Sequence, residues 1–98
     1  MGGRNEVAAF GRTLRRARRE RDLSQDALAL RAGVGVKHLS DLERGNKEPR
    51  LVTFLRLAAG LGLTGAELMA LYESAEDRET PRPPAEAPPL PGSDTPTN

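Results

Sequence analysis

Apolar residues recur at helical spacing in five successive stretches of the chain, and no stretch shows the apolar–polar alternation of a strand. Helices are predicted over residues 5–21, 25–32 and 36–44, in a fourth stretch after Pro49, and from Thr64 to about Glu73. The first carries its apolar stripe on Val7, Phe10, Leu14 and Ala17. In the fourth, the apolar positions are Leu51, Phe54, Leu55, Ala58 and Leu61. Leucines in every stretch predict a compact all-α domain.

Two glycines, Gly33 and Gly35, stand between the second and third predicted helices. A glycine inside a helix costs roughly 1 kcal/mol relative to alanine, so this pair marks a turn. Gly33 is expected to end one helix in the left-handed conformation, and Gly35 to cap the next. With Leu39 and Leu42 facing inward at i, i+3, the layout is a helix-turn-helix over residues 25–44.

Charge divides the chain into a basic body and an acidic tail. Residues 1–72 hold 13 of the 15 basic and 8 of the 14 acidic residues, which fits a domain that binds a polyanion. Seven of the eight prolines follow position 80. We therefore predict one domain over residues 5–74 and a disordered, acidic, Pro-rich tail over 75–98.

The composition argues against several classes of protein. The chain has no cysteine and one histidine, so neither a metal site nor a cofactor is expected. It has no apolar run of membrane-spanning length and no secretory signal, which favours a cytoplasmic protein with no membrane partner. Without a histidine–nucleophile pairing or a glycine-rich phosphate loop, an enzyme is not expected. No small-molecule effector is expected, because the residues outside the predicted helical domain show no pattern of a ligand-binding domain.

A set of short motifs follows the predicted helices in a fixed order over about residues 8–72. They are "LSQ" at the start of the second helix, "LA" and "AGV" around the turn, "LSDLERG" at the end of the third helix, a following proline, and "LAAGLGL" near the end of the fourth. This set resembles the lambda-repressor-like family, the Cro and XRE type of helix-turn-helix regulators. The resemblance implies a compact five-helix DNA-binding domain.

The resemblance also implies that the helix over 36–44 lies in the major groove of DNA. The predicted base-reading residues are Val36, Lys37, His38, Ser40 and Asp41. Lys37 is suited to guanine, Val36 to a thymine methyl, and Asp41 to cytosine N4, while Ser40 can donate or accept. For each of them, and for His38 at the flank, the alternative is ordinary exposure to solvent.

Phosphate contacts are expected on either side of that helix. In the family the glutamine that matches Gln25 binds a phosphate at a helix N-terminus. The other phosphate-binding candidates are Arg44, Asn46, Lys47 and Arg50, for which a solvated basic loop is the alternative. Four arginines of the first helix, on the face opposite its apolar stripe, are either solvated or steer the protein toward phosphates: Arg12, Arg15, Arg16 and Arg19.

Two features of the motif set concern the scaffold. The family pairs the glutamate of its "ERG" motif with an arginine of the first helix, which assigns Arg18 and Glu43 to a structural salt bridge. Asp22 stands at a helix end where the family usually has glycine, and Val36 is apolar where many relatives are polar. The second departure weakens the expected first base contact.

We therefore predict a sequence-specific transcriptional regulator of double-stranded DNA. It would be a repressor or autoregulator that binds a near-palindromic operator as a homodimer. Apolar residues near the last helix form either the dimer contact or the monomer core: Leu63, Leu68, Met69 and Tyr72. The alternative is an antitoxin or adaptor whose main role is protein–protein contact, and a steep fall of affinity with salt would favour DNA.

Overall fold

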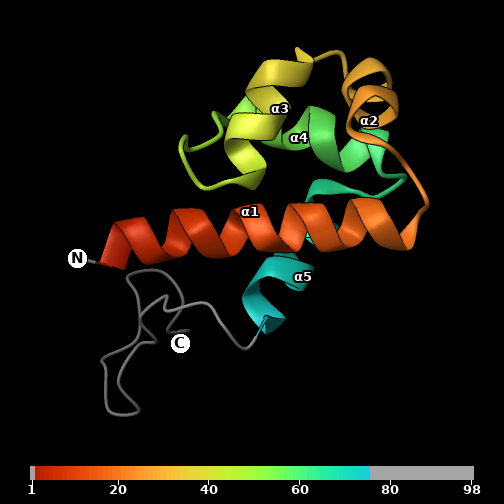
Figure 1. Cartoon of the computed structure of the whole chain (residues 1–98). Helices are drawn as coiled ribbons and strands as arrows, with labels where there is room; N and C mark the ends of the chain where they lie inside the picture. Colours follow the sequence, from red (N-terminus) through yellow and green to blue (C-terminus); the bar gives the residue numbers. More distant parts are fainter. Residues whose placement is uncertain (1, 76–98) are drawn as a thin grey trace, which may run out of the picture.

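Five α-helices occupy the residues that the computed structural model describes, 2–75 (Figure 1). They are α1 (Gly2–Glu20), α2 (Gln25–Ala32), α3 (Val36–Glu43), α4 (Leu51–Gly60) and α5 (Gly65–Ser74). The all-α fold and its five helices are confirmed. Three boundaries differ: α1 begins at Gly2 and ends at Glu20, and Arg44 is the C-cap of α3 rather than its last residue. The predicted tail lies, from residue 76 on, outside the described residues.

A single core collects one stripe from each helix. Six leucines are fully buried: Leu14, Leu28, Leu39, Leu42, Leu57 and Leu68. The rings of Phe10, Phe54 and Tyr72 pack together beside them, with centroids 5.7 Å and 6.0 Å from that of Phe10. Burying one leucine is worth about 1.5–3 kcal/mol, so these side chains dominate the stability of the fold.

The buried face of α4 differs from its sequence pattern. Leu51 and Leu55 are 74% and 47% exposed, whereas Leu57 is fully buried. The buried stripe consists of Phe54, Leu57, Ala58 and Leu61. These positions follow i, i+3, i+4 and i+7, but α4 is apolar over most of its circumference, so periodicity could not tell which leucines face the core.

Four helix ends share one backbone arrangement, in which a left-handed residue follows the last turn. Gly33, Gly45 and Gly62 adopt φ of 72°, 75° and 79°, and Asp22 adopts φ of 56°. At α2, the Val34 N–H donates to the Ala29 carbonyl at 3.0 Å and the Gly33 N–H to Leu30 at 3.3 Å. This is the Schellman pattern, which satisfies carbonyls that a helix end leaves free.

Replacing Asp22 by glycine is expected to raise the free energy of unfolding by about 1 kcal/mol. The left-handed conformation costs an L-residue roughly 1–2 kcal/mol, and the greater freedom of glycine in the unfolded chain offsets part of the gain. Urea denaturation measures the difference. The same change at Asp26, inside α2, should instead lower stability. A D22G variant that unfolds at or below the urea midpoint of the parent would contradict the expectation.

Two arginines bind the carbonyls at the C-terminal end of α4, a feature that the sequence pattern did not predict. Arg31 Nε donates to the Gly60 carbonyl at 2.8 Å, and Arg21 Nε donates to the Leu61 carbonyl at 2.9 Å. Positive charge is favourable at a helix C-terminus. These contacts fasten α2 and the end of α1 to α4.

The connection between α4 and α5 is a sharp, capped corner. Thr64 and Glu67 form a capping box, in which the Glu67 N–H donates to Thr64 Oγ1 and the Thr64 N–H donates to Glu67 Oε1. The two helix axes differ in direction by 94°. Within residues 2–75, no helix alone has the length and apolar content to cross a membrane, and α4 and α5 pass that test only as a pair across this bend.

Candidate nucleic-acid interface

The α2–α3 unit is built from local signals that the sequence carries. Ser24 Oγ accepts a hydrogen bond from the Ala27 N–H at 3.0 Å and so begins α2. Gly33 ends α2, and Gly35 is the N-cap of α3 with an ordinary φ of −72°. A Cβ atom on Gly35 would meet nothing within 4 Å, so the backbone at the N-cap of α3 is not packed against the rest of the domain.

The buried side of α3 fixes which residues face outward. Leu39 and Leu42 have no exposed surface, and Val34 of the turn packs against the same core. Among the predicted base-reading residues, Val36 is 43% exposed and the Lys37 side chain 88% exposed. His38, Ser40 and Asp41 are half-buried. The outer face of α3, which we define as Val36, Lys37, Ser40, Asp41 and Arg44, is therefore a polar surface with one apolar residue at its start.

Hydrogen bonds within α3 organise this outer face. Arg44 donates to Asp41 Oδ1 at 2.9 Å and to Ser40 Oγ at 2.8 Å. Lys37 Nζ lies 3.9 Å from the second carboxylate oxygen of Asp41. Asp41 is thus flanked by two cations one turn away on either side, which offsets its charge. Arg44, a predicted phosphate ligand, lies along the helix and keeps 59% of its side chain exposed.

The remaining phosphate candidates occupy two places. Asn46, Lys47 and Arg50 are exposed in the connection between α3 and α4. Gln25 begins α2, and its Nε2 donates to Glu43 Oε1 at 3.0 Å, so its amide is already bound to the last turn of α3. The sequence did not predict this contact, because nothing in the linear pattern links positions 18 residues apart.

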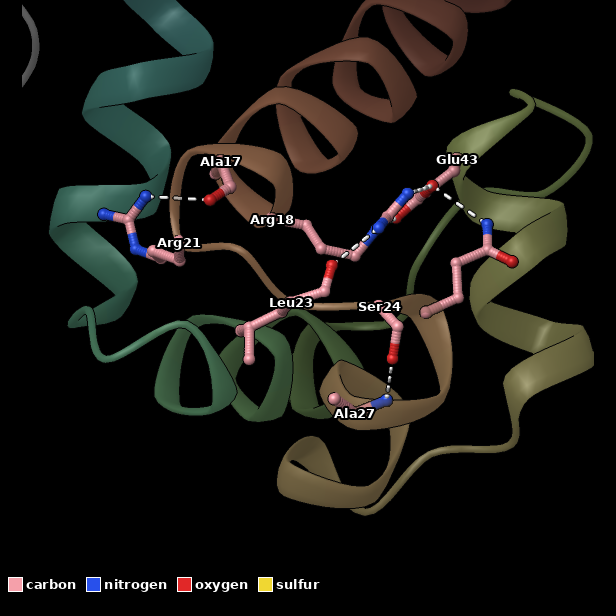
Figure 2. Close-up of polar contacts among 8 residues, drawn as sticks. Ala17, Arg18, Arg21, Leu23, Ser24, Ala27 and Glu43 are labelled. Atoms are coloured by element: carbon pink, nitrogen blue, oxygen red, sulfur yellow. Dashed lines mark hydrogen bonds and ion pairs between the residues drawn. The ribbon is translucent and has the colours of Figure 1, made fainter.

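Glu43 joins three helices through one buried network, as Figure 2 shows. Arg18 Nε donates to Glu43 Oε2 at 2.6 Å, and Arg18 Nη2 donates to Oε1 at 3.0 Å. The two side chains are only 10% and 2% exposed. Arg18 Nη1 also donates to the Leu23 carbonyl at 2.8 Å. The expected pair is present as a bidentate ion pair, and it links α1, the start of α2 and the end of α3.

A protruding helix held by a short glycine turn on an all-α scaffold is the geometry of a helix-turn-helix module. The helix-turn-helix domain family model matches residues 9–71, which span all of α2, α3 and α4. The chain belongs to this family, in its lambda-repressor-like, Cro/XRE-type branch of DNA-binding transcription regulators.

Individual relatives agree with this assignment. The chain is similar to the HTH-type transcriptional regulator y4dJ of Sinorhizobium fredii, with 39% identity over 59 residues, 60% of this chain and 77% of that protein. It is also similar to the control protein C.MunI of a Mycoplasma species, with 36% identity over 65 residues, 65% of this chain and 88% of that protein. A solved structure, the restriction-modification controller protein C.AhdI of Aeromonas hydrophila, matches with TM-score 0.61 and 35% identity, over 63% and 94% of the two chains.

Proposed function

We propose that this protein is a sequence-specific transcriptional regulator that reads one DNA half-site by placing α3 in the major groove. The outer face of α3 is the observation that carries the proposal. It offers a donor in Lys37, an acceptor in Asp41, a hydroxyl in Ser40 and a methyl-bearing side chain in Val36. Those are the chemical groups that distinguish base pairs in the major groove.

The proposed base contacts start from the two most exposed side chains in the first turn of α3. Lys37, the most exposed of the five, donates to guanine O6 and N7, and Val36 contacts a thymine methyl beside it. Ser40 and Asp41 lie one turn further along α3, where Asp41 accepts from cytosine N4. His38 lies at the flank of the first turn, where it contacts the edge of the groove.

Phosphate contacts fix the register of α3 in the groove. Gln25 keeps a second N–H after its bond to Glu43, and the first turn of α2 adds free backbone N–H groups. Asn46, Lys47 and Arg50 approach the backbone from the α3–α4 connection, and Arg44 uses the exposed part of its guanidinium. Because Gln25 is bound to Glu43, the buried network sets the distance between this phosphate contact and α3.

The protein acts as a homodimer on a near-palindromic operator in this proposal. Of the four candidate dimer residues, Leu68 is fully buried, and Leu63 and Tyr72 pack against the core. Met69 remains exposed, and so do three residues in the first half of α4: Leu51, Val52 and Leu55. Leu55 lies against Gly65 at the start of α5, which joins the two groups. A two-fold dimer through this face would cover a promoter, which is how a repressor or autoregulator acts.

Selection from randomised DNA duplexes at near-physiological salt tests the proposal. The expected result is an enriched palindrome whose half-sites lie about one helical turn apart. Weak, salt-sensitive binding without enrichment would reject specific reading. The absence of any salt-dependent binding would instead favour the antitoxin or adaptor alternative, in which the exposed apolar face of α4 and α5 binds another protein.

On the selected site, replacing Lys37 by alanine should weaken binding by about 1–3 kcal/mol, or about 5- to 150-fold in Kd. The variant should also relax preference at one base pair, because its donor to guanine is gone. Arg56→Ala is a matched control, since Arg56 is exposed on α4 and its loss removes the same charge. Titrations on sites substituted at each position measure both effects. Equal losses for K37A and R56A on every sequence would show that Lys37 reads no base.

A further inference from the structure

An arginine face on α1 has no part in the helix-turn-helix. Four exposed arginines occupy the side of α1 opposite its buried stripe: Arg12, Arg15, Arg16 and Arg19. Among residues 2–75, the structure gives Arg15, Arg16 and Arg19 no ion pair. Their neighbour Arg18 differs, because it turns toward α3 and is buried. So dense a set of like charges repels itself and attracts an anionic partner.

This arginine face continues into a cleft where the described chain ends. Arg16 and Glu20 of α1 line a cleft of about 510 Å³ together with Leu71, Ser74 and Ala75. α5 lies beside α1, on the side away from α2 and α3 in Figure 1. Ala75 is the last described residue. The chain therefore leaves the domain from the same cleft that holds Arg16.

The residues that follow Ala75 carry the opposite charge. Glu76, Asp77 and Glu79 place three carboxylates within four positions, against the single cation of Arg78, so residues 76–79 carry a net charge of −2. An extended chain advances roughly 3.3–3.6 Å per residue, so four residues reach about 13 Å. Along α1, Arg15 and Arg19 are separated by about 6 Å of axial rise, and Arg16 lies between them. All three arginines are thus within reach of this acidic segment.

We propose that the acidic segment, residues 76–79, docks on the arginine face of α1 as an intramolecular counter-charge. Exposed ion pairs are each worth about 0–1 kcal/mol and are screened by salt, so the contact is reversible. It persists because the tether keeps the segment at a high local concentration. While the acidic segment is bound, its carboxylates, rather than DNA phosphates, neutralise the arginine face of α1. The segment thereby lowers non-specific DNA affinity and leaves the outer face of α3 open.

The position of the arginine face favours this occupant over DNA itself. Arg16 shares its cleft with the end of α5, whereas the proposed reading face belongs to α3. A second copy of the chain could also supply carboxylates, but the tethered segment starts in the cleft and needs no encounter. DNA and a second copy are therefore the other outcomes that the experiment must separate.

A spin label on the tail tests the docking directly in the full chain. The sequence has no cysteine, so Thr80→Cys provides a single attachment site. At low salt, the nitroxide should broaden the NMR signals of the Arg15, Arg16 and Arg19 Nε–H groups several-fold more than that of Arg56 on α4. The effect should be lost in the E76Q/D77N/E79Q variant and at about 0.5 M salt, where screening is strong. A control variant, E86Q/D94N, removes two negative charges elsewhere in the tail and should keep the broadening.

Each alternative gives a different result. Equal broadening in E76Q/D77N/E79Q and the parent, or none in either, overturns the proposal. Broadening that decreases when the sample is diluted with protein that carries no spin label comes from contact with a second copy of the chain. That result also overturns the proposal. If the arginine signals change only when duplex DNA is added, the arginine face of α1 binds DNA rather than the acidic segment.

A second readout follows non-specific DNA affinity. A scrambled duplex should bind E76Q/D77N/E79Q several-fold more tightly than it binds the parent or E86Q/D94N. An unchanged affinity would overturn the counter-charge role. Because the label experiment contains no DNA, its result does not depend on the proposed function.

Discussion

The Glu43→Ala variant is expected to lose about 3–5 kcal/mol of unfolding free energy, the range found when one member of a buried ion pair is removed. Arg18 would keep its charge at a site where its side chain is only 10% exposed, with the Leu23 carbonyl as its remaining partner. The Gln25 amide would lose its acceptor as well. A loss of this size is comparable with the whole stability of many small domains, so the variant should be largely unfolded near body temperature.

A double variant distinguishes the cost of burying one unpaired charge from the net contribution of the ion pair to stability. Replacing Arg18 by methionine and Glu43 by leucine removes both charges and keeps apolar volume, so it should recover most of the loss. Urea and thermal denaturation, followed by circular dichroism, measure all three proteins. An E43A protein with the denaturant midpoint of the parent would refute the structural role of the pair. If the double variant does not recover the lost stability, Glu43 stabilises the fold through its packing rather than through its charge.

The Gly11→Ala variant should be destabilised by about 3 kcal/mol, the upper end for overpacking. A Cβ atom on Gly11 would lie 2.5 Å from the carbonyl oxygens of both Leu42 and Glu43. Both obstructing atoms are backbone, so no side-chain rotation relieves the clash and α3 must move away from α1. The clash has to outweigh a gain of about 1 kcal/mol, because alanine favours helix over glycine.

The same substitution should also affect DNA binding, because the displaced segment carries Glu43. Moving the end of α3 lengthens its contacts with Arg18 and Gln25, so both unfolding and the proposed half-site affinity should change. Gly35→Ala is the control, because a Cβ there would meet nothing within 4 Å and its φ is ordinary. Alanine is a poorer N-cap than glycine, but it also restricts the unfolded chain, so a net loss well under about 1 kcal/mol is expected. A G11A variant at least as stable as the parent would show that α1 and α3 do not need this close approach.

Local signals account for the elements that the sequence predicted well. The bounds of α2 were correct because Ser24 and Gly33 are a side-chain cap and a left-handed stop, which act within a few residues of themselves. Thr64 and Glu67 mark the start of α5 in the same way. Asp22 was recognised as an awkward helix end, and its φ of 56° agrees.

The sequence pattern predicted only part of the candidate site. Inward Leu39 and Leu42 oriented α3 correctly, so the exposure of Val36 and Lys37 followed from helical geometry. The pairing of Arg18 with Glu43 came from the family resemblance rather than from periodicity. Nothing local indicated that Gln25 would also bind Glu43, or that Arg44 would lie back along α3 toward Ser40.

By itself, the sequence determined the five helices, their caps, the α2–α3 turn and the outward face of α3, because each depends on dihedral preferences and spacing within one or two turns. Only the tertiary structure decided which leucines of α4 are buried, why Gly11 must lack a side chain, and how Glu43 connects α1, α2 and α3. These features depend on where helices distant in sequence cross. Close packing sets the crossing points, and no periodicity within a single helix encodes them.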